Sequence, residues 1–329
     1  VYKRQVLSRH DAVLVADALD DPNYVGQESI VALDLRSAMA APLFDNELVR
    51  GLLYVDTANP SVRYTQEDLQ VLTATANAVG IKLRNLSLER EMRTAGRIQR
   101  AMLPKELDVP SGYELEAHQV MCRAVGGDLY HFLHRPNGNM LLVLGDVAGK
   151  GMPAALAMGA AIVLVGMLAE IGGDLEDMAQ HLHRQLFSSL AEEQFLTLFL
   201  GELNGETGHL RFVNAGHDPP LLRRRDGSLE TLDPTGLPVA MLKDLTFSSG
   251  EVTLEPGDLL SVFSDGIPEA TPDSEHFLGL EPVTEILVEQ GTEDLSRIRA
   301  SIVDAVHGFL KGEPASDDVT LLLLRRNSG

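Results

Sequence analysis

From about residue 107 onward, short hydrophobic runs alternate with turn-forming residues. Runs of roughly four to eight residues bounded by Gly, Asn or Asp are typical of β-strands. These runs predict strands at Tyr113–Val120, Met140–Leu144, Leu196–Leu203, His209–Asn214, Leu221–Arg223, Leu259–Phe263 and Val319–Arg325. Stretches with helical periodicity predict helices at about 152–170, 174–192, 281–290 and 294–310.

The turns between these strands indicate how the strands pair. Asn137-Gly138, Asn204-Gly205 and Asp226-Gly227 are typical of hairpin turns, which join antiparallel neighbours. We therefore predict that residues 107–329 form one α+β domain with antiparallel sheets.

Residues 1–85 predict a separate, smaller α/β segment. The apolar runs Ser37–Leu43 and Leu48–Asp56 flank the turn-like Asp45-Asn46, which is typical of a hairpin. Thr65 then provides a helix N-cap, and acidic residues follow in the first turn.

The helix that follows is predicted to exceed thirty residues and to link the two parts. One apolar stripe has the three-and-four spacing of a coiled coil and consists of Leu69, Leu72, Ala76, Val79, Leu83 and Leu86. A second stripe, in another register, consists of Leu88, Met92, Ala95, Ile98 and Met102. We assign residues 86–106 as a coiled-coil linker that favours a homodimer; the alternative is a monomeric helix folded back on the domains.

The stretch from Gly151 to Ala169 holds no charged residue and is long enough to span a membrane. It also holds several helix-weakening residues and lies mid-chain between polar segments. The sequence therefore favours a buried helix of a large domain over a membrane span.

Charge and cysteine content narrow the function classes. The chain of 329 residues has 48 acidic and 27 basic residues, a net charge of −21. Such a surface repels phosphate backbones and anionic lipids, so we expect no nucleic-acid or membrane partner. Cys122 is the only cysteine, which excludes an internal disulfide and favours a reducing, cytoplasmic setting. Because the chain begins at Val1 without Met, we expect it to be part of a longer protein.

Acidic residues recur at predicted strand ends and tight turns. They lie in Gly126-Gly127-Asp128, Gly145-Asp146-Val147, Asp265-Gly266 and Asp317-Asp318. Neighbouring glycines let the backbone approach an ion closely, and oxygen-only ligands suit Mg²⁺ or Mn²⁺. Carboxylates that meet at one sheet edge could hold two such ions and activate a water for attack on phosphorus.

A nucleotide-binding P-loop is a different interpretation of Gly145–Gly151. The spacing is one residue short, and Gly151 occupies the position where Ser or Thr would bind magnesium. We therefore expect Lys150 to orient a loop or to contact phosphate locally.

Taken together and in order, these motifs resemble the metal-dependent serine/threonine phosphatases (PPM family), in particular the SpoIIE- and RsbU-like bacterial branch. The resemblance also rests on Pro153-Ala154-Ala155, Asn214-Ala215-Gly216-His217 and Glu269-Ala270, and it covers about residues 107–327. It implies an α-β-β-α sandwich of two antiparallel sheets with the metals at one edge.

The resemblance also implies roles for individual residues. Asp128 and Asp146 would contact both metals, with the backbone carbonyl of Val147 beside them. Asp265 and Asp317 would each bind one metal, and Asp318 would be a ligand or support one. The nucleophile would be a metal-activated water, with no side-chain nucleophile. Regulatory roles are assigned to the start of the apolar helix, namely Lys150, Met152, Ala154 and Ala155.

Two positions depart from the branch. Leu129 and His131 stand where it usually has an aromatic residue and Asp. We do not expect His131 and His134 to bind metal, and we expect His217 to brace a turn.

Residues 1–85 resemble the latter part of a GAF sensor domain, on the strength of Ser37–Asp56 and Tyr64–Leu83. The expected function is thus a phosphatase with two Mn²⁺ or Mg²⁺ ions, regulated through the GAF-like segment and the dimeric linker. Its expected substrate is phosphoserine or phosphothreonine on an anti-sigma-factor antagonist (STAS-type) protein. The alternatives are a catalytically silent sensing and docking module, or a metal-dependent small-molecule phosphatase.

Overall fold

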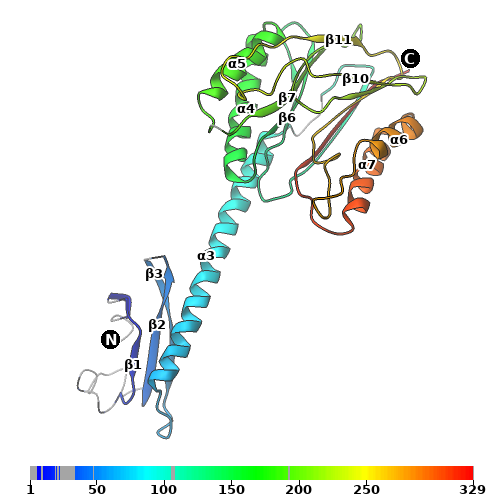
Figure 1. The fold of residues 1–329 in the computed structure, drawn as a ribbon. Coiled ribbons are helices and arrows are strands. Elements are labelled where there is room, and N and C mark those ends of the chain that lie inside the picture. The colour runs from blue at the N-terminus through cyan, green and yellow to red at the C-terminus, as the bar shows by residue number, and fades with distance from the viewer. Residues whose placement is uncertain are drawn as a thin grey trace. The chain divides into compact units, whose positions relative to one another are not determined.

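The computed structural model describes residues 6–8, 10–18, 20, 22, 34–46, 48–104, 108–191 and 193–328. The chain divides into two compact units, Val1–Glu91 and Met92–Gly329. Helix α3, Gln66–Met102, contributes to both. Each unit is described by itself (Figure 1).

The N-terminal unit contains a three-stranded antiparallel sheet in the order β1-β2-β3. Its strands are β1 (Val13–Val15), β2 (Ser37–Asp45) and β3 (Leu48–Thr57). The predicted hairpin is confirmed by the antiparallel pairing of β2 with β3. Helix α3 begins in a reciprocal capping box: the Thr65 backbone N–H donates to Asp68 Oδ2 over 2.8 Å, and the Asp68 N–H donates to Thr65 Oγ1 over 3.3 Å.

The apolar stripe of α3 has two environments. Leu69, Leu72 and Ala76 are buried in a cluster with residues of β2. From residue 81 to 91 every residue of the helix is exposed, including Leu83 at 50% and Leu86 at 46%. Burial within this unit therefore accounts for only the first half of the stripe.

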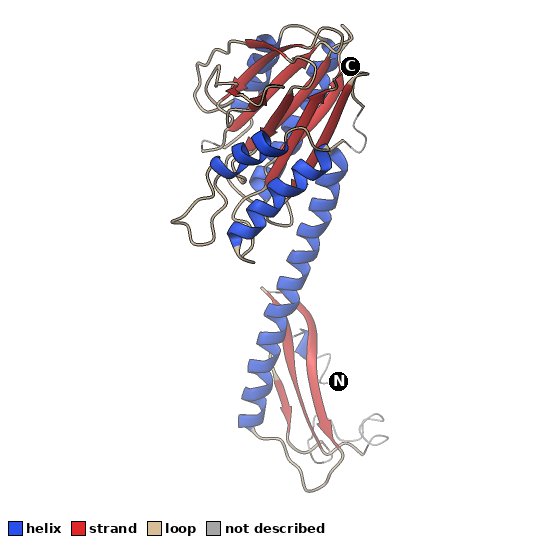
Figure 2. Cartoon of the chain, turned by 90° about the vertical axis from the view of Figure 1, so that its right-hand side faces the viewer, coloured by secondary structure: helices blue, strands red, loops and turns tan. Residues whose placement is uncertain are grey.

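The C-terminal unit is built on two five-stranded antiparallel sheets (Figures 1 and 2). One sheet has the order β11-β8-β7-β6-β5, from Gly250–Thr253, His209–Ala215, Leu196–Leu203, Met140–Val147 and Leu129–His134. The other has the order β10-β9-β12-β13-β4, from Leu229–Thr231, Leu221–Arg223, Leu259–Phe263, Val319–Arg326 and Tyr113–Val120.

Helices cover the outer face of each sheet. Helices α4 (Met152–Ile171) and α5 (Leu175–Phe187) contact the first sheet, and α6 (Glu281–Gln290) and α7 (Leu295–Leu310) contact the second. The inner faces enclose an apolar core in which the Phe199 and Phe212 rings stack at 5.8 Å. The predicted α-β-β-α sandwich is thereby confirmed.

The sequence patterns missed four strands, among them the three-residue β1 of the N-terminal unit, and misplaced one helix end. Strands β10 and β11 are short edge strands with few buried residues, and β5 carries His131 and His134 among its apolar positions. Helix α5 ends at Phe187, before the predicted end near 192. Short or polar-interrupted strands give little periodicity in the sequence. Their formation depends instead on pairing with other strands.

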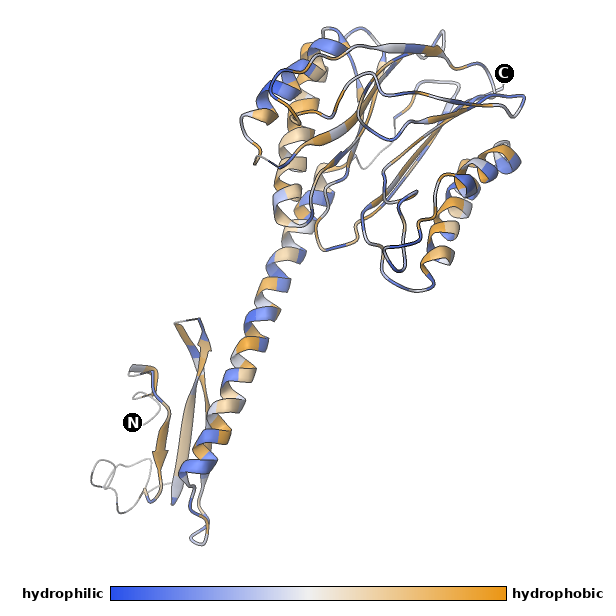
Figure 3. Ribbon diagram, viewed as in Figure 1, coloured by the Kyte–Doolittle hydropathy of each residue, from blue (hydrophilic) through white to orange (hydrophobic). Residues whose placement is uncertain are grey.

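Helix α4 departs from the prediction of a buried helix. One face is buried in the core through residues such as Ala157, Met158 and Ile162. The opposite face exposes Leu156 (68%), Val163 (62%), Met167 (49%) and Ile171 (70%), so the helix is apolar on both sides (Figure 3). By length and composition it passes the test for a membrane span, which core helices of soluble proteins pass as well.

Candidate functional site

The acidic motifs meet at one end of the sandwich because of the strand pairing. Asp128 directly precedes β5 and Asp146 lies near the end of β6, and the register pairs Leu129 with Gly145. Asp265 follows β12, and Asp317 and Asp318 precede β13, with which β12 pairs in antiparallel fashion. Sharp turns at these strand ends bring carboxylates from distant sequence positions together.

Asp128 lies at the most buried position of this cluster, with 1% of its surface exposed. Thr320 Oγ1 donates a hydrogen bond to Asp128 Oδ2, and Gln119 Nε2 donates to the Asp128 carbonyl over 3.0 Å. Burial raises the pKa of Asp128 well above its ordinary value, and the charges of Asp146 and Asp318 raise it further.

The neighbouring carboxyls share this environment. Burial raises the pKa of Asp146 to about 6, and the charges of Asp317 and Asp318 add to the shift. Burial also raises the pKa of Asp265 to about 7, with contributions from Asp146 and Asp317. Several anionic groups therefore repel one another where little water can screen them, which is the electrostatic condition that a bound cation relieves.

Asp318 accepts backbone hydrogen bonds at both carboxylate oxygens. The Cys122 N–H donates to Oδ1 and the Gly127 N–H donates to Oδ2, each over 2.8 Å. A Cβ on Gly126 would lie 2.0 Å from Asp318 Oδ2, so only glycine fits there. Asp318 thus fastens the loop that carries Asp128.

The other predicted ligands lie around Asp146. A Cβ on Gly127 would lie 2.9 Å from the Val147 carbonyl oxygen and 3.0 Å from Asp146 Oδ1, so these two oxygens flank the same point of the loop. Asp317 Oδ2 forms an ion pair with Lys150 Nζ over 2.7 Å.

The predicted regulatory residues link this edge to helix α4. Lys150 Nζ also donates to the Ser316 carbonyl over 2.7 Å. Met152 begins α4, and the Ala155 N–H donates to the Gly151 carbonyl over 3.0 Å. Ala154 is fully buried, and its Cβ lies 3.6 Å from a Cβ placed on Gly127. The first turn of α4 therefore packs against the loop before Asp128.

Four polar residues near the site were not singled out from the sequence. Thr320 holds Asp128, and Gln99 of α3 bonds both backbone groups of Gly126. Burial and the nearby charge of Glu269 raise the pKa of Asp218. Thr320 and Glu269 lie inside the motifs described above, and Asp218 directly follows His217. Their position next to motif residues was the only sequence feature that could have indicated them. No such feature indicated Gln99.

The histidines contact other partners. His131 Nδ1 accepts from the Phe132 N–H over 2.9 Å, and His134 Nε2 lies 3.1 Å from Asp108 Oδ2. His217 is buried; its N–H donates to Asn214 Oδ1 over 2.8 Å, and its Nδ1 lies 3.0 Å from Thr197 Oγ1. Burial lowers the pKa of His217 to about 4, so the ring is neutral at physiological pH.

Cys122 lies with Asp317 and Asp318 in a group whose ligand atoms are all within 4.8 Å of one another. Burial raises the pKa of its thiol to about 12, and Asp318 adds to the shift. In the metal-free chain the thiol is therefore protonated, which disfavours it as a ligand. The oxygen donors of the site fit Mg²⁺ or Mn²⁺ instead.

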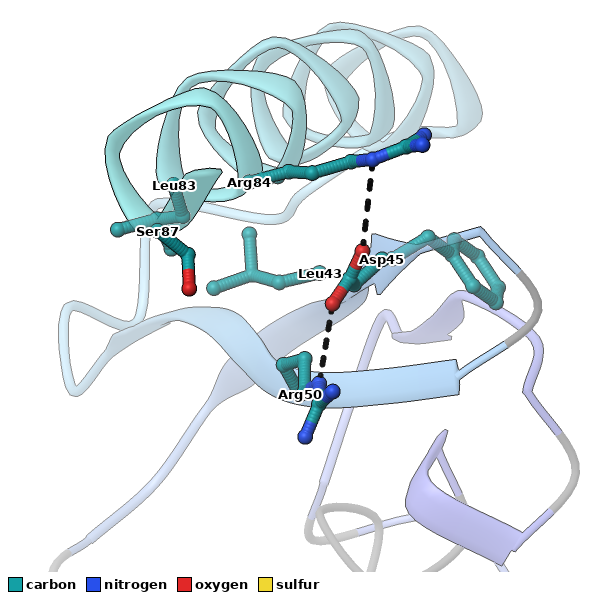
Figure 4. Close-up of a pocket in the computed structure, with 8 residues that line it drawn as sticks. Leu43, Asp45, Arg50, Leu83, Arg84 and Ser87 are labelled. Carbon is teal, nitrogen blue, oxygen red and sulfur yellow. Dashed lines mark hydrogen bonds and ion pairs between the residues drawn. The ribbon is translucent and has the colours of Figure 1, made fainter. Parts of the chain in front are cut away.

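A separate pocket of about 300 Å³ lies within the N-terminal unit, between the β2–β3 hairpin and α3 (Figure 4). Leu43 and Leu83 line it, and Asp45 lies between two arginines (Figure 4). Arg50 Nε lies 3.2 Å from Asp45 Oδ2, and Arg84 Nε lies 3.8 Å from Asp45 Oδ1. These ion pairs are partly exposed, so they contribute little stability.

Comparison with protein families gives two matches. The description of stage II sporulation protein E (SpoIIE) matches residues 136–327, and that of the GAF domain matches residues 2–83. These ranges fall in the sandwich and in the N-terminal unit, respectively.

Among individual proteins, the chain is 25% identical over 240 residues to phosphoserine phosphatase RsbU of Bacillus subtilis, covering 73% of this chain and 71% of RsbU. It is 26% identical over 288 residues to protein IcfG of Synechocystis, covering 78% of this chain but only 44% of IcfG.

Solved structures share the fold. The SiaA-PP2C domain of Pseudomonas aeruginosa has a TM-score of 0.64 at 21% identity, covering 73% of this chain and 97% of that domain. The RsbU and RsbW domains of Rv1364c from Mycobacterium tuberculosis have a TM-score of 0.59 at 24% identity, covering 69% of this chain and 63% of that one.

The raised carboxyl pKa values predict how the metal-free chain responds to pH. In the folded state Asp265, with a pKa of about 7, holds its proton more tightly than in the unfolded state, where the pKa is near 3.8. Its contribution therefore favours folding below about pH 4 and is lost as the pH rises through 7. In EDTA, Asp265→Asn should gain stability relative to wild type, and this difference should grow by about 2–3 kcal/mol between pH 5 and pH 8.

Chemical denaturation of both proteins at each pH measures this difference, and terms from the histidines cancel in it. Adding Mn²⁺ at pH 8 should stabilise the wild type more than Asp265→Asn. A difference that stays constant or shrinks toward pH 8 would show that the Asp265 carboxyl is not under this electrostatic pressure.

Proposed function

The chain belongs to the SpoIIE family, and on that premise we propose that its C-terminal domain is a metal-dependent phosphatase that hydrolyses phosphoserine or phosphothreonine on a protein. The observation that carries the proposal is the convergence of Asp128, Asp146 and Asp265, all with raised pKa values, at one end of the sandwich. We assign residues 1–85 to a GAF-like sensor, 86–106 to a linker and 107–329 to the phosphatase.

We propose that Asp128, Asp146, Asp265, Asp317 and the Val147 carbonyl hold two Mn²⁺ or Mg²⁺ ions. Such ions, when bound, supply an activated water as nucleophile, so no side-chain nucleophile is required. The chain itself fixes the donor oxygens: Thr320 orients Asp128, Lys150 orients Asp317, and Asp318 fastens the Asp128 loop. Asp318 is thereby proposed as a positioning residue more than as a ligand.

The substrate proposal goes further than the site chemistry. RsbU, the relative covered to 71% of its length, is by name a phosphoserine phosphatase. We propose that this chain acts in the cytoplasm on a phosphorylated anti-sigma-factor antagonist of the STAS type. The net charge of −21 disfavours a nucleic acid as the partner.

Replacing one carboxylate tests the activity. Asp146→Asn keeps the side-chain shape but removes a charged donor, so Mn²⁺-dependent turnover of a phosphoserine protein should fall by at least about 100-fold. The matched control is Asp304→Asn on the exposed face of α7, which should retain wild-type turnover. Single-turnover phosphate release measures both.

The outcomes separate the competing functions. Wild-type chain inactive on every phosphoprotein, but still binding partners, would identify a docking module. Turnover confined to small phosphate esters would identify a small-molecule phosphatase.

Regulation through α3 is supported by a direct contact with the site loop. Gln99 is 4% exposed; its Nε2 donates to the Gly126 carbonyl over 2.6 Å, and its Oε1 accepts from the Gly126 N–H over 3.0 Å. A Cβ on Gly96 would lie 1.9 Å from the Ala124 carbonyl oxygen, so the helix backbone packs closely against this loop. Movement of the last turns of α3 would therefore displace Gly126, two residues before Asp128.

Removing the Gln99 amide should loosen the metal site. Gln99→Ala abolishes both hydrogen bonds, so the apparent affinity for Mn²⁺ in the turnover assay should fall about 10-fold. A tenfold loss corresponds roughly to the free energy of one hydrogen bond between uncharged groups. Arg97→Ala, at an exposed position of the same helix, is the control and should leave the affinity unchanged. Lower stability with unaltered metal affinity in Gln99→Ala would mean that Gln99 only supports the fold.

We propose that the exposed half of the α3 stripe pairs with a second copy of the chain. Leu83 and Leu86 continue the spacing of the buried Leu69 and Leu72 but stay about half exposed, at 50% and 46%. A parallel partner helix would bury them as a coiled-coil seam.

Light scattering on the full chain tests this dimer. The double variant Leu83→Glu/Leu86→Glu places like charges in the seam and should halve the mass, whereas Asn85→Glu, outside the stripe, should leave a dimer. A wild-type chain that is monomeric at micromolar concentration contradicts the proposal.

A further inference from the structure

Three arginines line a cavity at the end of the sandwich away from the acidic cluster. The cavity has a volume of about 520 Å³, and its lining includes Glu114, Arg223, Arg225, Gly291 and Arg325. It adjoins the start of β12 and the end of β13, whereas Asp265 follows β12 and Asp317 precedes β13. It therefore lies outside the proposed metal site.

Strand register brings the arginines together. Arg223 of β9 pairs with Leu259 of β12, Leu259 pairs with Arg325 of β13, and Arg325 pairs with Glu114 of β4. Residues in one such row share a face of the sheet. Leu259 packs in the core under α6 and α7, so both arginines lie on that covered face, beside the turn between the two helices.

The arginines have few anionic partners within the described residues. Arg223 is 6% exposed and forms no ion pair there; its Nη1 donates to the Arg224 carbonyl over 3.3 Å, and its Nε has no hydrogen-bond partner. The side chain of Arg225 is exposed and likewise has no ion pair among these residues; only its backbone N–H donates to a carboxylate, Asp258 Oδ1, over 3.0 Å.

Arg325 is better satisfied but incompletely so. Its Nη2 donates to the carbonyls of Gly291 (3.1 Å) and Glu293 (2.6 Å), and its Nη1 lies 3.7 Å from Glu114 Oε2. Its Nε is buried without a partner. Asp226 and Asp294 act on Arg223 and Arg325 only at longer range. Capping of the C-terminal end of α6 thus accounts for the hydrogen bonds of Arg325 Nη2. It accounts for no contact of Arg223 or Arg225.

Burying a guanidinium without a carboxylate is costly unless another anion compensates. The chain as a whole has a net charge of −21, whereas this cavity is lined by three arginines and one glutamate. Guanidinium groups match the oxygens of phosphate through paired hydrogen bonds. The lining carries three positive charges and one negative, an excess that matches a dianion.

We propose that this cavity is a binding site for a phosphate-type dianion, either inorganic phosphate or the phosphoryl group of a small monoester. Its size is in the range of small-ligand pockets. The site is independent of the proposed phosphatase activity, because it shares no residue with the acidic cluster.

Calorimetric titration of the full chain with inorganic phosphate in EDTA tests the site, since EDTA removes binding through metal ions. The wild type should bind phosphate saturably, with a Kd of about 1 mM or tighter. Arg223→Gln and Arg225→Gln should each weaken binding about 10-fold or more. Arg184→Gln, on the exposed face of α5, is the control and should bind as wild type does.

Arg225 is exposed, so Arg225→Gln keeps the test valid if Arg223→Gln fails to fold. Phosphate should also raise the Tm of the wild type but not of Arg225→Gln. Repeating the titration with phenyl phosphate separates the sources: equal or tighter binding indicates a monoester ligand, and binding of inorganic phosphate alone indicates the free anion. No saturable binding to the wild type, or equal affinity in all variants, overturns the proposal.

Discussion

The burial of Asp128, Asp146 and Asp265 close together is the constraint on which the rest of the sandwich depends. Burial is the main cause that raises the pKa of each, and the charge of Asp146 raises the pKa of both Asp128 and Asp265. Such an arrangement persists only where the surrounding backbone holds the groups in place. Antiparallel pairing on both sheets provides that support, because it carries strand ends with acidic turns to a common edge.

The loops at this edge are held by small, specific contacts. Asp318 binds two backbone N–H groups, and Gly126 leaves room for its carboxylate. Gln99 of helix α3 forms hydrogen bonds with the backbone N–H and the carbonyl of the same glycine. One loop therefore joins the proposed ligand Asp128, the carboxylate that fastens it and the helix proposed to regulate it, which gives a signal a short physical route to the metal site.

The two ends of strands β12 and β13 have opposite electrostatic character. One end carries Asp265 and Asp317, and the other carries Arg325 beside Arg223. The rigid strands keep these charges apart along their length, so the acidic end suits cations and the basic end suits an anion. The exposed apolar face of α4 and the exposed half of the α3 stripe are further surfaces that the described chain leaves uncovered.

The sequence by itself determined an α+β domain with antiparallel pairing, most strand and helix positions, and the acidic motifs, because long apolar runs and glycine-flanked Asp residues are local patterns. The two-sheet sandwich was expected only from the resemblance to the phosphatase family. It could not reveal β1, β5, β10 and β11, whose short or polar-interrupted runs form strands through pairing with other strands. Nor could it show that α4 is buried on one face only, since the number of covering elements is a tertiary property. The roles of Gln99 and of the arginine row were decided by the tertiary structure alone, because hydrogen bonds and strand register join residues that are tens of positions apart.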